Sequence, residues 1–389
     1  MDRSVNRNLP LLFLIKVCKW FMLYMPVVKL FYAENNLDDF DLFFLHAIYS
    51  AVIFLIEVPS GYLADIWGRK NSLLLGLLLG ITGFSFYSFT AGFWGFLIAE
   101  IALGIGEGFI SGSDSALLYD TLFQQKKQEK YIRYEGRITG GGNLAEALAG
   151  VTVTFLALNP LRGYYYLQTI LTLAGFIAAW FLIEPKVHTH ERVISWKAIV
   201  NIVKDTLWHN PVLSRYVIFS AIIGFSSLTM AWLAQIFLFQ AKIPNTYFGI
   251  IWAVLNGMVA LGSILSHRID NFLGQKLSLV YIFFFLSAGY FVASGTIAPY
   301  GLVFLLVFYF VRGTAHPILK DRIQAFTESG VRATVLSVRS LIIRIMFALL
   351  GPVIGIITEK ISLSVALLTS GSIILIPGLF LVILINKKK

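Results

Sequence analysis

Long apolar runs, separated by short polar stretches, recur along the whole chain. Twelve such runs can be marked, each of about 20 residues, which is the length a helix needs to cross a ~30 Å hydrocarbon core. The alternating pattern typical of membrane-spanning strands is absent from these runs, so they predict helices. The predicted spans cover residues 9–32, 42–63, 71–90, 94–117, 136–158, 163–184, 214–240, 246–266, 276–296, 299–320, 334–357 and 362–385.

The predicted spans form two sets of six, separated by a polar stretch that includes "SWKAIVNIVKDTLWHN". Its apolar residues recur at helical spacing, which predicts a helix lying on the membrane surface. We therefore expect an all-α integral membrane protein with two six-helix halves, residues 1–184 and 214–389, joined by a linker over residues 185–213. A weak repeat supports duplication, because "SHRIDNFLGQK" occupies the place of "GYLADIWGRK" with the register offset by one residue.

Composition and charge agree with a membrane protein. Of 389 residues, 57% are hydrophobic and only 13% are charged, and the mean hydropathy is +0.77. The net charge of +10 does not indicate nucleic-acid binding, because most basic residues lie in the loops on one side of the predicted spans. That asymmetry places both termini in the cytoplasm. No N-glycosylation sequon occurs, and we expect a monomer in a bacterial inner (plasma) membrane.

One loop carries a recognisable motif. The segment "PSGYLADIWGRKNSL", between the second and third predicted spans, resembles the loop motif of the major facilitator superfamily, G-x-L-a-D-r-x-G-r-k-x-x-l. The resemblance implies that Asp65 faces the start of the eleventh span and that Arg69 pairs with an acid at the foot of the fourth, where Asp120 stands. These contacts would lock the cytoplasmic side. The predicted conformational latch comprises Gly61, Asp65, Gly68, Arg69, Lys70 and Asp120.

Charged residues inside the predicted spans are candidates for function, because each costs several kcal/mol unless it is paired or faces water. The fourth span carries three acids at intervals of seven residues, which on one helix form a stripe of roughly 20 Å. The first span carries two lysines and the tenth carries "FYFVRGTAHPILKDR". The resemblance implies that these spans line a central cavity. The predicted cavity residues are Lys16, Lys19, Glu100, Glu107, Asp114, Arg312 and His316.

Within this set, Glu107 and His316 take equivalent positions when Gly104 is aligned with Gly313 across the proposed duplication. An acid and a histidine at such positions can relay a proton, or they can form a static salt bridge between the halves. Both alternatives stay open. Four further charges fall in the spans that contact the other half in the family. We expect these to form interhelical ion pairs, with Glu146–Arg344 as one example: Glu57, Glu146, Arg339 and Arg344.

Departures from family patterns bear on the substrate. Glu100 stands where proton-coupled members often have arginine, and the G-P-x-x-G-G pattern typical of drug exporters is missing from the fifth span. The predicted cavity also holds nearly equal numbers of both charges. We therefore expect a secondary transporter for a zwitterion or an organic anion, coupled to protons. The alternatives are a multidrug/proton antiporter, a lipid or amphiphile flippase, and a membrane receptor or enzyme built on the same scaffold.

No motif indicates an enzyme, a cofactor or a metal. The sequence has no P-loop, zinc-protease pattern or nucleophile elbow. "HTHE", at residues 188–191, has metal-binding residue types but no further ligands close by in sequence. The single cysteine, Cys18, excludes an internal disulfide. The expected partners are a small-molecule substrate, protons and the lipid bilayer, without nucleic acid.

Overall fold

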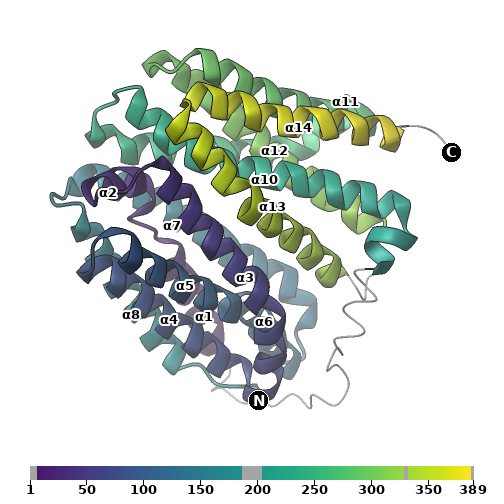
Figure 1. Ribbon diagram of the computed structural model, residues 1–389. Helices are drawn as coiled ribbons and strands as arrows, with labels where there is room; N and C mark the ends of the chain where they lie inside the picture. Colours follow the sequence, from purple (N-terminus) through teal and green to yellow (C-terminus); the bar gives the residue numbers. More distant parts are fainter. Residues whose placement is uncertain (1–6, 186–203, 328–331, 387–389) are drawn as a thin grey trace. The chain divides into compact units, whose positions relative to one another are not determined.

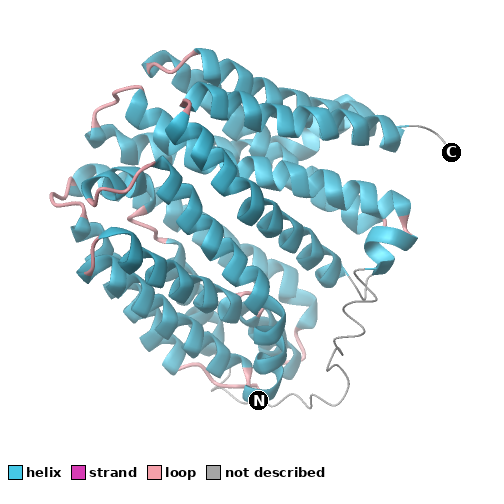
Figure 2. Ribbon diagram, in the orientation of Figure 1, coloured by secondary structure: helices cyan, strands magenta, loops and turns pink. Residues whose placement is uncertain are grey.

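The computed structural model describes residues 7–185, 204–327 and 332–386, and in these ranges every regular element is helical (Figure 2). The predicted all-α class is therefore confirmed. Nine helical segments in the described part are long and apolar enough to cross a membrane. One of them, Asn245–Gly295, contains 51 residues. The protein is thus a multi-pass membrane protein, while the count of twelve spans and the side of the membrane on which the termini lie stay predictions.

The helices belong to two compact units. The first comprises Met1–Leu37, Ile48–Val193 and Thr246–Ala253, and the second comprises Asp38–Ala47, Ile194–Asn245 and Val254–Lys389. Compared with the predicted halves, residues 38–47 and 246–253 are assigned to the opposite unit. The boundaries at residues 184 and 214 stay a prediction. Most of the predicted linker helix and the "HTHE" segment lie outside the described residues. The described end of the linker forms a π-helical turn over Asp205–His209.

The first unit holds the helices of the N-terminal part of the chain, labelled in Figure 1. Helix α4 packs against α5 and α8, while α1 packs against α6, α7 and α8. Leucine and isoleucine side chains from α1, α4, α5 and α6 form its core. The bounds are α1 (Asn8–Trp20), α2 (Val28–Glu34), most of α3 (Asp39–Trp67), α4 (Arg69–Phe89), α5 (Gly92–Ile110), α6 (Ser113–Gln124), α7 (Tyr131–Leu156) and α8 (Arg162–Trp180).

The second unit is built around α10, which packs against α12, α13 and α14. Helix α11 covers two predicted spans and is kinked at Gly274, whose φ of 74° is a left-handed conformation that glycine adopts without a steric penalty. The kink lies between the predicted spans 246–266 and 276–296. The bounds are α10 (Pro211–Gln240), most of α11 (Phe248–Gly295), α12 (Leu302–Ala325), α13 (Arg332–Lys360) and α14 (Leu363–Asn386).

Candidate functional site

Two ion pairs join α1 to the fourth predicted span. Lys16 Nζ lies 3.0 Å from Asp114 Oδ2, and Lys19 Nζ lies 2.7 Å from Glu107 Oε2. The lysines are three residues apart on α1 and therefore share one face of that helix. The side chains of all four residues are between 17% and 24% exposed. Each charge is thus compensated within the first unit while water still reaches the pairs.

The acidic stripe does not run along one continuous helix, as the sequence predicted. Helix α5 ends at Ile110 and α6 begins at Ser113, so the prediction of a single helix over 94–117 is wrong. The break places Asp114 in the first turn of α6, where a carboxylate is favoured by the helix dipole. Its Oδ1 accepts a hydrogen bond from the Ser115 backbone N–H at 2.7 Å. Helix geometry as well as Lys16 therefore holds this carboxylate.

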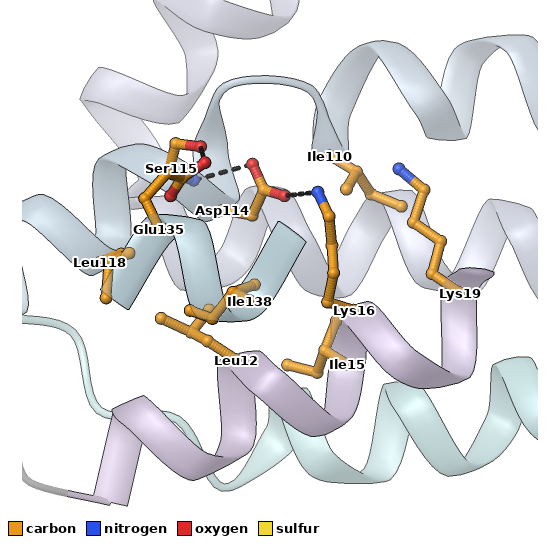
Figure 3. Close-up of a pocket in the computed structure, with 10 residues that line it drawn as sticks. All are labelled: Leu12, Ile15, Lys16, Lys19, Ile110, Asp114, Ser115, Leu118, Glu135 and Ile138. Carbon is orange, nitrogen blue, oxygen red and sulfur yellow. Dashed lines mark hydrogen bonds and ion pairs between the residues drawn. The ribbon is translucent and has the colours of Figure 1, made fainter. Parts of the chain in front are cut away.

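A small pocket surrounds the Lys16–Asp114 pair (Figure 3). At one end, Ser115 Oγ donates a hydrogen bond to Glu135 Oε1 of α7 at 2.9 Å. Apolar side chains form the rest of the wall, and the space has room for about one water molecule. The pocket therefore combines both signs of charge with an apolar surface. Its lining residues are Leu12, Ile15, Lys16, Lys19, Ile110, Asp114, Ser115, Leu118, Glu135 and Ile138.

Glu100 lies in different surroundings. The residue is only 4% exposed and accepts a hydrogen bond from the Tyr87 hydroxyl. That hydroxyl in turn lies 2.7 Å from the Tyr32 hydroxyl. The rings of Phe96 and Tyr165 lie 4.6 and 4.9 Å from the Tyr87 ring. The three acids predicted to act as one set are therefore of two kinds: two paired with lysines and one held by a tyrosine chain among aromatic rings.

The structure places the predicted latch residue Arg69 against Asp120. Arg69 Nε lies 2.7 Å from Asp120 Oδ2, and Arg69 Nη2 lies 3.3 Å from Asp65 Oδ1. Gly68, with φ of 94°, makes the turn before α4. A Cβ atom added at Gly61 would have no described atom within 4 Å, so there is open space beside this glycine. The function of these residues as a latch stays a prediction.

The sequence analysis missed Glu184 at this loop. Its carboxylate accepts hydrogen bonds from the backbone N–H groups of Arg69 and Lys70, at 2.8 and 2.7 Å. These groups are the first N–H donors of α4, which lack partners inside the helix. Glu184 therefore caps α4 from the end of the sixth predicted span. The one available signal was an acid immediately before Pro185.

The second unit has a corresponding ion pair with the charges exchanged. Arg322 Nη2 contacts both carboxylate oxygens of Asp270, at 2.7 and 2.6 Å. Its Nη1 also lies 3.1 Å from Asp321 Oδ2. Gln275 stands where the repeat would place the loop arginine. The arginine comes instead from the last turn of α12, just after the tenth predicted span. This pair too was missed, since the repeat is offset by one residue.

The predicted basic residues of the second unit lie on α12 and α13. The Arg312 guanidinium lies 5.3 Å from the centre of the Tyr309 ring, and His316 is exposed. Arg339 Nε donates a hydrogen bond to Ser220 Oγ of α10 at 2.5 Å. Arg344 is half-buried on α13.

Two predicted pairs join residues of different units, Glu107–His316 and Glu146–Arg344. Both stay predictions. Glu57 lies on α3 and Glu146 on α7, and both are expected to take part in interhelical pairs.

Comparison with known proteins decides the family. The model of the Major Facilitator Superfamily matches residues 12–352. The chain belongs to this superfamily. It is accordingly a transporter and not an enzyme, and it works in the membrane as a multi-pass protein. Among the curated proteins, no sequence matches the chain.

Solved structures of other superfamily transporters share the fold at low sequence identity. A mutant of the nucleoside transporter NupG is 15% identical, with a TM-score of 0.82 over 98% of this chain and 100% of that one. A mutant of the peptide transporter POT, in complex with sulfate, is 14% identical, with a TM-score of 0.77 over 97% and 94%. A bacterial homolog of the human lysosomal transporter Spinster is 14% identical, with a TM-score of 0.72 over 99% and 97%. At these identities the likeness concerns the fold alone.

Proposed function

We propose that this superfamily member is a secondary active transporter that moves a small zwitterionic or anionic organic solute by alternating access, coupled to protons. The observation that carries the proposal is the Lys19–Glu107 ion pair, with its atoms 2.7 Å apart and both side chains partly exposed. A partly exposed pair of opposite charges can exchange partners, because an incoming charge replaces the one that leaves. Solutes and protons of the expected kinds both supply such charges.

The chemistry of this exchange follows from the groups present. A proton that neutralises Glu107 releases Lys19, whose ammonium group then accepts a solute carboxylate as its new partner. If instead a solute carboxylate binds to Lys19 while Glu107 is still ionised, the Glu107 carboxylate is released and binds a solute ammonium group. Each charge keeps a partner at every stage, so no isolated charge is left in the membrane. Coupling between proton and solute follows directly from sharing one ion pair.

Alternating access requires contacts that form in one state and break in another. The Arg69–Asp120 pair and the Glu184 cap are suited to this role, because they hold the loop before α4 to α6 and to the segment after α8 by polar contacts. Such contacts can be lost without exposing an apolar core. We propose that the protein works as a monomer in a bacterial inner membrane, with both termini in the cytoplasm.

The drug-antiporter alternative receives less support from the site. A transporter for bulky cations needs acids that are available to the substrate, whereas Glu107 and Asp114 are both paired with lysines of α1. The lipid flippase alternative has no specific observation in its favour.

Solute flux into proteoliposomes under an imposed pH gradient tests the proposal. Solutes are first chosen by their ability to raise Tm of the purified protein. Uptake should depend on the gradient in the native protein, and Glu107→Gln should abolish that dependence while leaving downhill exchange. Glu129→Gln, at an exposed position, is the matched control and should behave like the native protein. Unchanged proton dependence in Glu107→Gln would remove this residue from the coupling mechanism.

A further inference from the structure

The helices of the second unit carry acids only near their ends or beside a kink. Helices α10 and α14 contain no aspartate or glutamate. Asp270 lies just before the kink in α11, Asp321 lies in the last turns of α12, and Glu359 is next to the last residue of α13. The interior of α12 and α13 nevertheless carries four basic groups: Arg312, His316, Arg339 and Arg344.

Three of these groups share one region of the unit. Arg312 and His316 are four residues apart on α12 and therefore occupy the same face of the helix. The positive charge of Arg339 on α13 acts on His316 together with that of Arg312. The neighbouring charge that acts on His316 from the end of α12, that of Lys320, is also positive. The neighbouring charges that act on His316 are therefore all positive.

Both arginines are oriented by contacts that do not neutralise them. The ring of Tyr309 lies beside the Arg312 guanidinium at 5.3 Å, and Ser220 accepts a hydrogen bond from Arg339 Nε. These contacts fix the planes of the guanidinium groups while leaving the positive charge uncompensated. The side chains of both arginines are half-buried and that of His316 is exposed, so a small ligand can reach them.

No carboxylate in the described part of this unit forms an ion pair with Arg312, His316 or Arg339. The carboxylates of Asp270 and Asp321 contact Arg322 instead. Cationic groups at membrane depth cost several kcal/mol each without compensation. The lysines of α1, by contrast, are each neutralised by an acid of their own unit. Arg312, His316 and Arg339 therefore have no compensating carboxylate among the described residues of their own unit.

We propose that Arg312, His316 and Arg339 form a binding site for an oxyanion group of the transported solute, a carboxylate or a phosphate. The inference rests on the proposed function and narrows it, because the solute must carry a negative charge whatever else it carries. Guanidinium groups match this chemistry, since their parallel N–H donors fit two oxygens of one carboxylate or phosphate. The imidazole of His316 adds a further donor from the same helix face as Arg312.

Thermal unfolding of the purified full-length protein tests the site. Sodium sulfate serves as the probe, compared with sodium chloride at equal ionic strength, because sulfate presents the oxyanion geometry without an organic part. Sulfate should raise Tm saturably, and Arg312→Gln and Arg339→Gln should each weaken its apparent affinity about tenfold or more. Arg268→Gln, at an exposed position on α11, is the control that should leave the affinity unchanged. Equal curves for sulfate and chloride, or equal affinity in all variants, would overturn the site.

A second readout separates an oxyanion site from a structural role. Without an oxyanion, Arg312→Gln should raise Tm, because it removes an uncompensated positive charge from the cluster. If Arg312 were part of a structural ion pair, Arg312→Gln would lower Tm instead. A lower Tm of this variant would therefore refute the proposal. Parallel titrations with phosphate and succinate distinguish the two sources of the anionic group: a larger shift with one of them identifies phosphate or carboxylate as the preferred chemistry, and no shift with either counts against the site.

The proposed function can fail separately from this site. Proteoliposomes that take up a neutral or cationic solute, from a protein on which sulfate has no effect, would refute the oxyanion site alone. Binding of sulfate that depends on Arg312, in a protein through which no solute passes, would refute transport alone.

Discussion

In the first unit, α1 is joined to α5 and α6 by ion pairs of opposite sign, whereas the interior of α12 and α13 in the second unit, away from the helix ends, carries basic groups only. Lys16 and Lys19 each have an acid within 3.0 Å. Arg312 and Arg339 contact a ring and a hydroxyl group instead. The difference teaches that the two units do not share one chemistry: the charges of the first are balanced, as the proposed exchange of partners requires, and the basic groups of the second fit the proposed oxyanion site.

The loops that follow the second span of each unit differ in a related way. Arg69 stands in the first loop itself and reaches Asp120, with its side chain 25% exposed. In the second unit the acid, Asp270, belongs to α11, and Arg322, 8% exposed, lies in the last turn of α12, just after the tenth predicted span. The arginine of the first pair is thus more open to water than that of the second, while the two acids are 19% and 18% exposed. We therefore expect the first to be a switch and the second to be a permanent structural contact.

The largest effect should come from breaking the buried loop pair. Arg322→Met removes one partner and leaves Asp270, whose side chain is 18% exposed, without its bidentate partner, which should lower the free energy of unfolding by about 3 kcal/mol. The double variant Arg322→Met/Asp270→Leu should recover most of that loss. Denaturant or thermal unfolding in detergent measures both. If Arg322→Met is as stable as the native protein, the Arg322–Asp270 pair is not a permanent structural contact, and the expected difference from the Arg69–Asp120 pair is contradicted.

The next effect concerns the exception within the first unit, Glu100. Tyr87→Phe removes the hydroxyl that donates to this carboxyl group and breaks the link to Tyr32. The loss should be about 1–3 kcal/mol in the free energy of unfolding, because a buried acceptor loses a hydrogen bond. The matched control is Tyr62→Phe, whose side chain is exposed and which should leave stability unchanged. Equal stability of the two variants would mean that the tyrosine chain does not hold Glu100.

A smaller effect is expected for the exchangeable ion pair. Lys19→Met should reduce solute flux about tenfold, which corresponds to ~1.4 kcal/mol, because Glu107 loses the charge with which it exchanges. Reversing the pair, with Lys19→Glu and Glu107→Lys together, should restore part of the flux. Counterflow of a labelled solute in proteoliposomes measures both variants. If Lys19→Met transports at the native rate, the pair is structural and the balanced first unit has no part in transport.

The smallest effect should come from the helix cap. Glu184→Gln keeps the size of the side chain but weakens its hydrogen bonds to two N–H groups of α4, which should cost about 1 kcal/mol or less. Tm of the purified protein measures the change. Glu129→Gln, on an exposed side chain, should leave Tm unchanged. A loss comparable to that of Arg322→Met would place Glu184 among the permanent contacts instead of the switchable ones.

Much of the fold could be predicted from the sequence, because hydrocarbon thickness imposes a length on every span. The marked runs fall on helices, and the motif around Asp65 led to the family. The paths of two spans were not predictable: the predicted span 9–32 is divided into α1, which ends at Trp20, and α2, which begins at Val28. In the fourth span, a glycine in an apolar run does not show whether the backbone turns there. Gly112 has φ of 80°, and the fourth span breaks at this point.

The candidate site was harder to predict than the fold. Sequence spacing shows which charges share a helix face, and this placed Lys16 and Lys19 together. It does not show which face meets which, so the pairing of Lys19 with Glu107 came only from the structure. Contacts between distant backbone and side-chain groups, such as Glu184 with the start of α4, leave no periodic pattern in the sequence. The same holds for Arg322 and Asp270.

The position of Glu184 has a mechanical consequence for the chain that follows it. This residue is bound to the first N–H groups of α4 and is followed at once by Pro185 and the linker to the second half. The linker is therefore tethered at the signature loop and not at a loose helix end. The point at which the chain leaves the first half is thus bound to the loop that carries the family motif, so a movement of that loop would also move this point.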